Sequence, residues 1–235
     1  MEQSERDIFI KNIFCKVAPY VDPLSTAFSF GLCNVWRRKL VSLSGIKKGD
    51  HVLDICTGTG ELAVLLVDAV GPEGSVTGAD FCEDMLGRAI GKIDPAVQNV
   101  SFVVSDAKDL VFPDDTFDVV TVSFGMRNIP DTTSALREAR RVLKPGGRFI
   151  CLELTQPEKT WFLPVYKWYI FKVIPFLGKI FTHSSDPYSY LPVSIEAYYP
   201  PEEFKRIIEE CGFSHVKAYP LSVGIATIYR GDNDG

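Results

Sequence analysis

An α/β fold built on a doubly wound, seven-stranded, mostly parallel sheet is the architecture that the sequence predicts. Short apolar stretches alternate with amphipathic helical stretches between residues 51 and 154, which is the pattern of strand–helix–strand units with parallel strands. A glycine-rich turn at 57–60 follows the first apolar stretch, and such turns mark the ligand-binding edge of open parallel sheets. Two further strand-like stretches, 214–219 and 222–230, meet at a turn signal, Pro220. We therefore expect an antiparallel strand pair at the C-terminus.

The elements follow in order along the chain. A helical section comes first, because apolar residues recur at helical spacing within residues 4–46. Five apolar stretches then predict the parallel strands, at 51–56, 75–80, 100–104, 117–123 and 148–154. The helices predicted between and after these strands span 62–70, 83–92, 131–143 and 201–210. Local signals support these limits: Gly71-Pro72 ends the first of these helices, Asp131 is a suitable N-cap, and Lys144-Pro145-Gly146-Gly147 stops the helix that Asp131 begins.

The composition excludes several classes of protein. The chain has 25 basic and 30 acidic residues, for a net charge of −5, so no nucleic-acid partner is expected. The six cysteines include no C-x-x-C pair and the three histidines lie far apart, so no metal site is expected. Scattered free cysteines and an acidic N-terminal segment unlike a secretory signal predict a reducing cytoplasm. No apolar run approaches the roughly 18 residues of a membrane span.

The strongest motif is the turn Asp54-Ile55-Cys56-Thr57-Gly58-Thr59-Gly60. Gly58 and Gly60 leave the backbone open to a ligand at the start of a helix. Asp80 follows 20 residues beyond Gly60, at the end of the second strand, where a carboxylate can accept hydrogen bonds from both hydroxyls of a ribose. The glycines alone fit both a nicotinamide dinucleotide and S-adenosylmethionine.

Charge and neighbouring strand ends favour S-adenosylmethionine. Asp54 and Glu61 flank the glycines, and two acids would repel a pyrophosphate but attract a sulfonium cation and an amino group. Asp106 follows the third strand, where its carboxylate can accept a hydrogen bond from an adenine amino group, and Ala107 leaves room for the ring. Ser123 ends the fourth strand, close to the expected methionine part of the cofactor.

With these residues in place, the sequence resembles the class I S-adenosylmethionine-dependent methyltransferases, which have a Rossmann-like sheet. More narrowly, it is similar to the UbiE/MenG family of quinone-biosynthesis C-methyltransferases, from about Phe14 to Arg230. The most diagnostic segments are Ser123-Phe124-Gly125-Met126-Arg127-Asn128, Ser29-Phe30-Gly31-Leu32 with Trp36-Arg37, and Tyr188 to Ile195; Phe112 to Asp118 and Leu143 to Gly147 are more widely shared. The resemblance implies methylation of a ring carbon of a polyprenyl quinol, most directly demethylmenaquinol in menaquinone biosynthesis.

Carried over by position, the resemblance implies cofactor contacts from Thr59, Asp80, Asp106, Ala107 and Ser123, with Gly58 and Gly60 forming the loop. Asp54 joins this predicted cofactor-binding set through its charge beside the glycines. The chain departs from the family pattern in two places. Cys56 stands where a glycine or alanine is common. In addition, the tyrosine of an N-terminal Tyr-Asp pair is displaced by one residue, to Tyr20, and Ser25 replaces the asparagine that follows Asp22.

Arg127 and Asn128 are the predicted catalytic residues, because they follow the fourth strand at the methyl end of the cofactor. Ionisation of a quinol hydroxyl makes the adjacent ring carbon nucleophilic, and a guanidinium, which stays protonated, stabilises the resulting phenolate. Asn128 would orient the ring by hydrogen bonding. The structural alternative is that Arg127 pairs with Asp131 or Glu138 and only holds the loop. Weaker candidates for the proton acceptor are His183, Asp22 and Asp186.

The stretch 156–199 interrupts the strand–helix alternation and is rich in aromatic residues interspersed with lysines. We expect it to be partly a packed cover and partly an apolar lid for a polyprenyl quinol. Its composition also suits contact with an anionic membrane surface, which predicts a cytoplasmic enzyme peripheral to the inner face of the cell membrane. The expected single domain, 1–235, then comprises an N-terminal helical cover (1–48), a cofactor-binding core (49–155), this lid (156–199) and a C-terminal helix with antiparallel strands (200–235).

Other functions remain open at this point. The same fold and lid suit C-methylation of a polyprenyl benzoquinol in ubiquinone biosynthesis, alone or in addition, and the fold alone suits a small-molecule O- or N-methyltransferase. An NAD-dependent oxidoreductase fits the glycines but is opposed by Asp54, Glu61 and Asp106. A non-catalytic carrier of lipid quinones would have no use for an intact cofactor turn.

Overall fold

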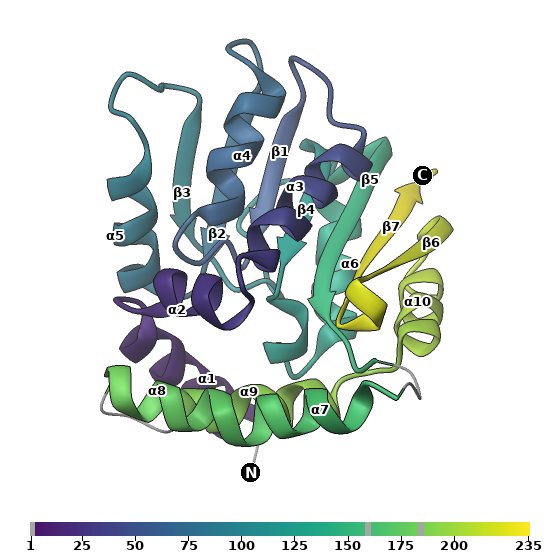
Figure 1. The fold of residues 1–235 in the computed structure, drawn as a ribbon. Coiled ribbons are helices and arrows are strands. Elements are labelled where there is room, and N and C mark those ends of the chain that lie inside the picture. The colour runs from purple at the N-terminus through teal and green to yellow at the C-terminus, as the bar shows by residue number, and fades with distance from the viewer. Residues whose placement is uncertain (1–2, 158–160, 183–185) are drawn as a thin grey trace.

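The computed structural model describes residues 3–157, 161–182 and 186–235. A twisted sheet forms the centre of the molecule, helices cover both of its faces, and a further group of helices lies across one edge of the sheet, at the bottom of Figure 1. That group combines N-terminal helices with helices inserted late in the chain, which are coloured purple and green. Segments far apart in the sequence therefore meet at one edge of the sheet.

The seven strands have the order β3-β2-β1-β4-β5-β7-β6. Neighbouring strands from β3 to β5 are parallel, and β7 is antiparallel to both β5 and β6. The predicted doubly wound, mostly parallel sheet with an antiparallel C-terminal strand is therefore confirmed, and its switch point lies between β1 and β4. The strands are β1 (His51–Ile55), β2 (Ser75–Asp80), β3 (Val100–Val104), β4 (Phe117–Ser123), β5 (Leu143–Leu154), β6 (Ser214–Leu221) and β7 (Ala226–Asn233).

Successive side chains of each central strand point to opposite faces, and each face has its own hydrophobic core. Val52 packs with helices α3 (Leu32–Ser44) and α4 (Glu61–Val70), whereas its neighbour Leu53 packs with α6 (Thr132–Val142) and α10 (Pro201–Glu210). Helix α5 (Glu83–Lys92) lies beside β3. Burial on both faces explains why the strands are continuous apolar runs in the sequence.

The N-terminal helical section is divided into three helices, α1 (Gln3–Val17), α2 (Val21–Phe28) and α3, rather than one run over 4–46. Phe30 and Gly31 lie between α2 and α3 with φ values of 52° and 79°. A right-handed helix cannot continue through residues in the left-handed region. The chain therefore turns at these residues, which brings α2 across the edge of the sheet.

Two strand limits also differ from prediction. Strand β5 begins at Leu143 rather than 148, because Leu143 already pairs with Phe117, and the register shifts before Val119 pairs with Arg148. The C-terminal turn lies at Ser222–Gly224, a short 3-10 segment (η3), rather than at Pro220, which is within β6 and opposite Thr227. The strand β7 accordingly starts at Ala226 instead of residue 222.

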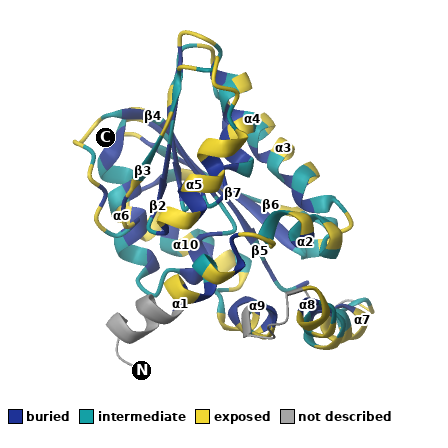
Figure 2. Cartoon of the chain, turned by 90° about the vertical axis from the view of Figure 1, so that its left-hand side faces the viewer, coloured by how far each residue is buried: buried dark blue, intermediate teal, exposed yellow. Residues whose placement is uncertain are grey.

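One continuous helical run crosses the edge of the sheet below the strands. It consists of α7 (Leu163–Trp168), a π-helical turn η2 (Tyr169–Val173) and α8 (Ile174–Thr182), and α9 (Asp186–Ala197) lies beside it. Its inner side buries Tyr166, Ile170 and Ile174 against Leu24 of α2 and Tyr188 of α9. Away from the cavity, this run exposes the apolar side chains of Phe176 and Ile180, and Figure 2 shows exposed stretches along α7 and α8 in yellow. Within the described ranges, no helix combines the length and apolar character needed to cross a membrane.

A stability prediction follows from the core beneath α10. Phe204 is fully buried, with its ring 4.9 Å from that of Tyr229 in an edge-to-face arrangement. Phe204→Ala should lower the free energy of unfolding by about 3–5 kcal/mol, because it removes a buried ring and leaves a cavity. The matched variant Phe176→Ala removes a ring that is 65% exposed and should change it by less than about 0.5 kcal/mol. Equal losses in urea unfolding would contradict the placement of either side chain.

Candidate functional site

A cavity of about 810 Å³ lies between the carboxyl ends of the parallel strands and the helices that cross them. This volume is within the range of roughly 300–1,000 Å³ that is usual for small-molecule sites. The cavity is lined by most of the residues predicted from sequence: Asp54, Gly58, Thr59, Asp80, Asp106, Ala107, Ser123, Arg127 and Asn128. Gly60 is not part of the lining. The fold thus brings together residues from four strand ends and the segment after β4.

The glycine turn presents bare backbone to this cavity. Gly58 has a φ of 56°, and a Cβ added there would have no atom within 4 Å, so the space above it is open. Gly60 has a different role, because an added Cβ would lie 2.9 Å from the Cβ of Ala89 on α5. Cys56 also has a positive φ, 53°, which favours glycine. The departure from a small residue at position 56 therefore carries a backbone cost as well as a larger side chain.

Asp54 ties the turn to the neighbouring strand. Its carboxylate accepts hydrogen bonds from the hydroxyls of Thr57 and Thr121, both at 2.7 Å. The side chain is almost fully buried, and this burial raises the pKa of Asp54 to about 6, although the two hydrogen bonds and nearby Arg37 act in the opposite direction. A carboxyl with this pKa changes its charge just below neutral pH.

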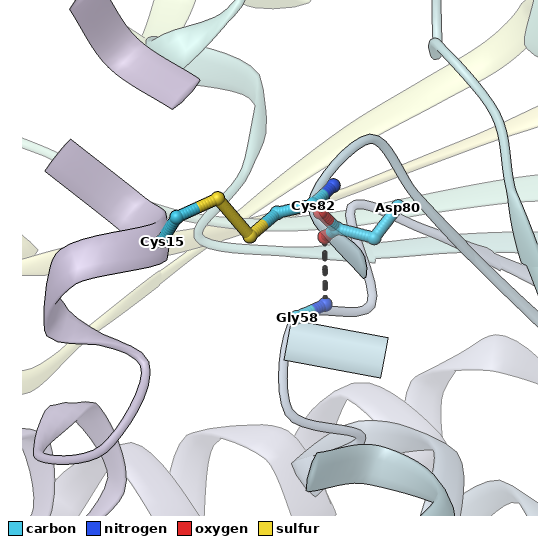
Figure 3. The surroundings of a disulfide bond; sticks show 4 residues. All are labelled: Cys15, Gly58, Asp80 and Cys82. Carbon is cyan, nitrogen blue, oxygen red and sulfur yellow. Dashed lines mark hydrogen bonds between the residues drawn. A yellow bond between two sulfur atoms is a disulfide. The ribbon is translucent and has the colours of Figure 1, made fainter. Parts of the chain in front are cut away.

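Asp80 joins the end of β2 to the glycine turn. Its Oδ2 accepts a hydrogen bond from the backbone N–H of Gly58 at 2.8 Å, shown as a dashed line in Figure 3, and its Oδ1 accepts from the N–H of Cys82 at 3.0 Å. Burial raises the pKa of the Asp80 carboxyl, against the effect of these two bonds. Each carboxylate oxygen has further acceptor capacity, so Asp80 can hold the turn and still accept from a ligand hydroxyl.

Asp106 and Ala107, which follow β3, both line the cavity but differ in their exposure to solvent. The Asp106 side chain is 53% exposed and accepts a hydrogen bond from the N–H of Lys108, whose ammonium lies 3.6 Å from the second carboxylate oxygen. Ala107 is buried and leaves the adjacent wall flat. Asp106 is therefore at the mouth of the cavity, whereas Asp54 and Asp80 are inside.

A lysine neutralises the acids at the other side of the turn. The Lys92 ammonium lies 2.6 Å from Asp22 and 2.5 Å from Glu61, and it also contacts the Thr59 hydroxyl, which donates to Asp22 at 2.5 Å. Sequence reasoning counted Glu61 as an attraction for a cationic ligand, but this charge is already compensated. Asp22 is likewise engaged, and the electrostatic attraction of the site depends on Asp54 and Asp80.

Three buried polar atoms at the end of β4 have no hydrogen-bond partner: Ser123 Oγ, Arg127 Nε and Asn128 Oδ1. All three side chains line the cavity. The Asn128 amide nitrogen is held by the Phe124 carbonyl at 3.2 Å, which leaves the amide oxygen for a ligand. Buried polar groups normally have partners, so this cluster is prepared to accept and donate hydrogen bonds to a bound molecule.

Arg127 forms an ion pair with a residue that sequence reasoning missed. Its guanidinium donates from Nη1 to Glu153 Oε1 at 2.7 Å and to the Phe124 carbonyl at 2.6 Å. The proposed pairing of Arg127 with Asp131 or Glu138 is wrong, because Asp131 caps α6 through Ser134 and Glu138 binds Arg141. The sequence signal for Glu153 was a single acid within the apolar run Ile150 to Leu154.

Tyr166 of α7 was predicted only as one of many lid aromatics. It is buried, lines the cavity and experiences the charge of Arg127. Burial raises the pKa of Tyr166 to about 12, so its hydroxyl remains protonated at neutral pH and can donate a hydrogen bond. Tyr20, in contrast, is 44% exposed and does not line the cavity. His183 lies outside the described residues, as does the side chain of Asp186.

The expectation that all cysteines are free is wrong for one pair. Cys15 of α1 and Cys82, which follows β2, form a disulfide with a Cα–Cα distance of 6.1 Å (Figure 3). Their 67-residue separation gave no spacing signal. One three-residue group of metal-ligating types occurs in the described part of the chain, Cys15, Cys82 and Asp84, and the disulfide occupies both of its sulfurs. The disulfide anchors α1 beside Asp80.

Comparisons with known proteins agree with this geometry. A family model described as the ubiE/COQ5 methyltransferase family matches residues 1–233. A demethylmenaquinone methyltransferase from Staphylococcus aureus (strain JH9) is 41% identical over 223 residues, which cover 94% of this chain and 92% of that protein.

Solved structures share the fold at low identity. A SAM-dependent methyltransferase from Aquifex aeolicus superposes with a TM-score of 0.62 at 22% identity, covering 83% of this chain and 88% of that one. Phosphoethanolamine N-methyltransferase 2 of Haemonchus contortus, in complex with S-adenosyl-L-methionine, has a TM-score of 0.64 at 16% identity, covering 85% and 52%. The sheet, the cavity at its carboxyl edge and the family match along nearly the whole sequence lead to one conclusion: the chain belongs to the ubiE/COQ5 methyltransferase family.

Proposed function

We propose that this methyltransferase transfers the methyl group of S-adenosylmethionine to a ring carbon of demethylmenaquinol, the step named in its Staphylococcus aureus relative. One observation carries the proposal. The unpartnered atoms Ser123 Oγ, Arg127 Nε and Asn128 Oδ1 lie in the same cavity as the glycine turn and the apolar lid helices. A quinol ring with two hydroxyls and a prenyl tail would use both kinds of surface.

The residues around the turn fit S-adenosylmethionine. The open space above Gly58 accepts a ligand close to the backbone, and Asp80 can accept from a ribose hydroxyl beside it. Asp54, Thr59 and Ser123 would surround the methionine part, and Asp106 and Ala107 the adenine, while Gly60 supports the turn from behind. When bound, S-adenosylmethionine supplies an electrophilic methyl group on a positively charged sulfur.

Arg127 and Asn128 would prepare the ring. The Nε–H of Arg127 can donate to a ring oxygen and stabilise its ionised form, and the Asn128 amide oxygen can accept from the second hydroxyl. Ionisation releases the hydroxyl proton to solvent and pushes electron density onto the adjacent carbon, which forms the new C–C bond as the sulfur–methyl bond breaks. After the transfer, the proton on that carbon is exchanged for a proton on the ring oxygen, which restores the aromatic quinol, so that one proton is released for each methyl group transferred. Burial of the site excludes water during the methyl transfer itself and favours the loss of charge that accompanies the transfer.

The lid (residues 156–199) would hold the prenyl tail and face a lipid surface. Its inner side is apolar, and Tyr169 fastens it to α2 by donating to the Phe28 carbonyl at 3.0 Å. Its outer side combines Phe176 and Ile180, which are 65% and 52% exposed and do not line the cavity, with Lys172 and Lys179. Exposed apolar side chains with lysines suit insertion into an anionic interface, so the enzyme would be cytoplasmic and peripheral to the inner face of the membrane.

The direct test is methyl transfer from methyl-labelled cofactor, followed by mass spectrometry of the quinol. Reduced demethylmenaquinone should gain one labelled methyl on carbon. Arg127→Ala should lose at least about a hundredfold in turnover while S-adenosylmethionine affinity changes less, because the guanidinium would act on the ring. The control variant Arg206→Ala changes an exposed arginine on α10 and should keep wild-type turnover and cofactor affinity. Labelling only of a benzoquinol or of hydrophilic acceptors would refute the proposed substrate, and full turnover in Arg127→Ala would remove Arg127 from the mechanism.

Asp54 predicts a pH dependence of cofactor binding. If the cofactor's amino group needs the carboxylate, S-adenosylmethionine affinity should fall about tenfold for each pH unit below the Asp54 pKa of about 6. The pH dependence of folding stability has the opposite sign. Because folding raises the Asp54 pKa from 3.8 to about 6, the contribution of Asp54 to stability is present below pH 3.8 and is lost as pH rises through about 6. In Asp54→Asn both dependences should disappear. A flat affinity between pH 5 and 7 in the wild type, measured by calorimetry, would contradict the assignment.

Membrane contact is tested by vesicle flotation. The wild type should bind vesicles containing anionic lipid and bind zwitterionic vesicles less. Phe176→Ser/Ile180→Ser should reduce binding more than tenfold, because two large apolar side chains outside the cavity lining no longer insert. The control Ile90→Ser/Val111→Ser changes residues with similar exposure, 60% and 64%, elsewhere on the surface, and should bind normally. Absence of wild-type binding at every lipid composition would refute the contact.

A further inference from the structure

Glu153 is a fully buried acid at the carboxyl end of β5. Both of its oxygens are engaged: Oε1 accepts from Arg127 Nη1 at 2.7 Å and from the N–H of Leu154 at 2.8 Å, and Oε2 accepts from the N–H of Arg127 at 3.0 Å. The Arg127 side chain is itself only 7% exposed. The two charges are therefore withdrawn from solvent together and compensate each other.

This ion pair lies next to the turn that would hold the cofactor. A Cβ added at Gly125 would be 2.5 Å from the Cβ of Cys56, so the segment carrying Arg127 packs directly on the glycine turn. The Cys56 thiol experiences the charges of Asp80, Asp54 and Glu153 together. Arg127 and Asp54 line one cavity.

Charge compensation at this position matters for a cationic ligand. At an effective dielectric constant of about 20, two like unit charges on the order of 10 Å apart repel enough to weaken binding on the order of tenfold. An unpaired guanidinium in the cavity would therefore oppose the binding of a sulfonium there. The thioether left after methyl transfer is neutral at sulfur and would not experience this repulsion. A change in net charge at the Arg127–Glu153 pair should thus alter the affinity for the two forms unequally.

We propose that Glu153 is a specificity-determining residue: by neutralising Arg127 it lets the cavity bind the sulfonium of S-adenosylmethionine without repulsion and sets its affinity relative to S-adenosylhomocysteine. The proposal rests on the proposed function for the identity of the cofactor. It assigns Glu153 an electrostatic role in addition to holding the guanidinium in place.

The test compares dissociation constants for S-adenosylmethionine and S-adenosylhomocysteine by calorimetry. Glu153→Gln preserves the shape of the side chain but leaves Arg127 uncompensated. Its affinity for S-adenosylmethionine should fall about tenfold and that for S-adenosylhomocysteine less than twofold. Arg127→Gln, which leaves Glu153 as the excess charge, should shift the ratio in the opposite direction, and the double variant should restore it. The matched control is Glu138→Gln, which removes the acid beside Arg141 outside the cavity while Arg141 keeps its ion pair with Asp114, and it should not change the ratio.

Each outcome decides the proposal. Equal losses for both ligands in Glu153→Gln would mean that Glu153 only supports the fold, and would overturn the electrostatic role. If Glu153→Gln does not fold, the ratio in Arg127→Gln decides, and an unchanged ratio there overturns the proposal as well. Wild-type protein that binds neither ligand would instead refute the cofactor assignment on which the proposed function depends.

Discussion

The carboxylate of Asp54 connects the parts of the molecule on which the site depends. It is buried at the end of β1 and accepts from Thr57 in the glycine turn and Thr121 in β4. Because β4 lies beside β1 at the switch point of the sheet, these two hydrogen bonds fix the turn relative to the strand that leads into Ser123 and Arg127. Buried acids normally have hydrogen-bond partners, and here the two hydroxyls that bind Asp54 belong to the glycine turn and to β4, which border the cavity.

The cavity has two chemically different halves that meet at Arg127. Asp54 and Asp80 lie on the side of the glycine turn, whereas the lid helices contribute apolar and aromatic walls such as Tyr166 and Ile170. Charges are compensated at both limits of the polar half, by Lys92 on one side and by the Arg127–Glu153 pair on the other. The site therefore combines hydrogen-bonding groups with an apolar wall, and the charges beside its polar half are paired.

Local sequence patterns predicted much of this arrangement. Features that depend on contacts between distant segments of the chain could not be predicted from such patterns. The strands, the glycine turn and the N-cap at Asp131 follow from short-range signals and are present in the structure. The Cys15–Cys82 disulfide joins residues 67 apart without any spacing rule. The partner of Arg127 was missed because Glu153 lies 26 residues further along the chain, at the end of the neighbouring strand β5, and no local spacing links the two residues. Phe30 and Gly31 broke the N-terminal helix through backbone conformation rather than polarity.

The central claim is that Arg127 stabilises the ionised form of a bound quinol hydroxyl. Its most direct measurement is an absorbance titration of a prenylated naphthol, whose naphtholate absorbs at longer wavelength than the neutral form, bound to the protein with S-adenosylhomocysteine. The account predicts that the bound hydroxyl ionises at a lower pH than the free naphthol in the wild type, and that this shift is lost in Arg127→Ala. Ionisation of the bound naphthol at the same or a higher pH in the wild type would contradict the account.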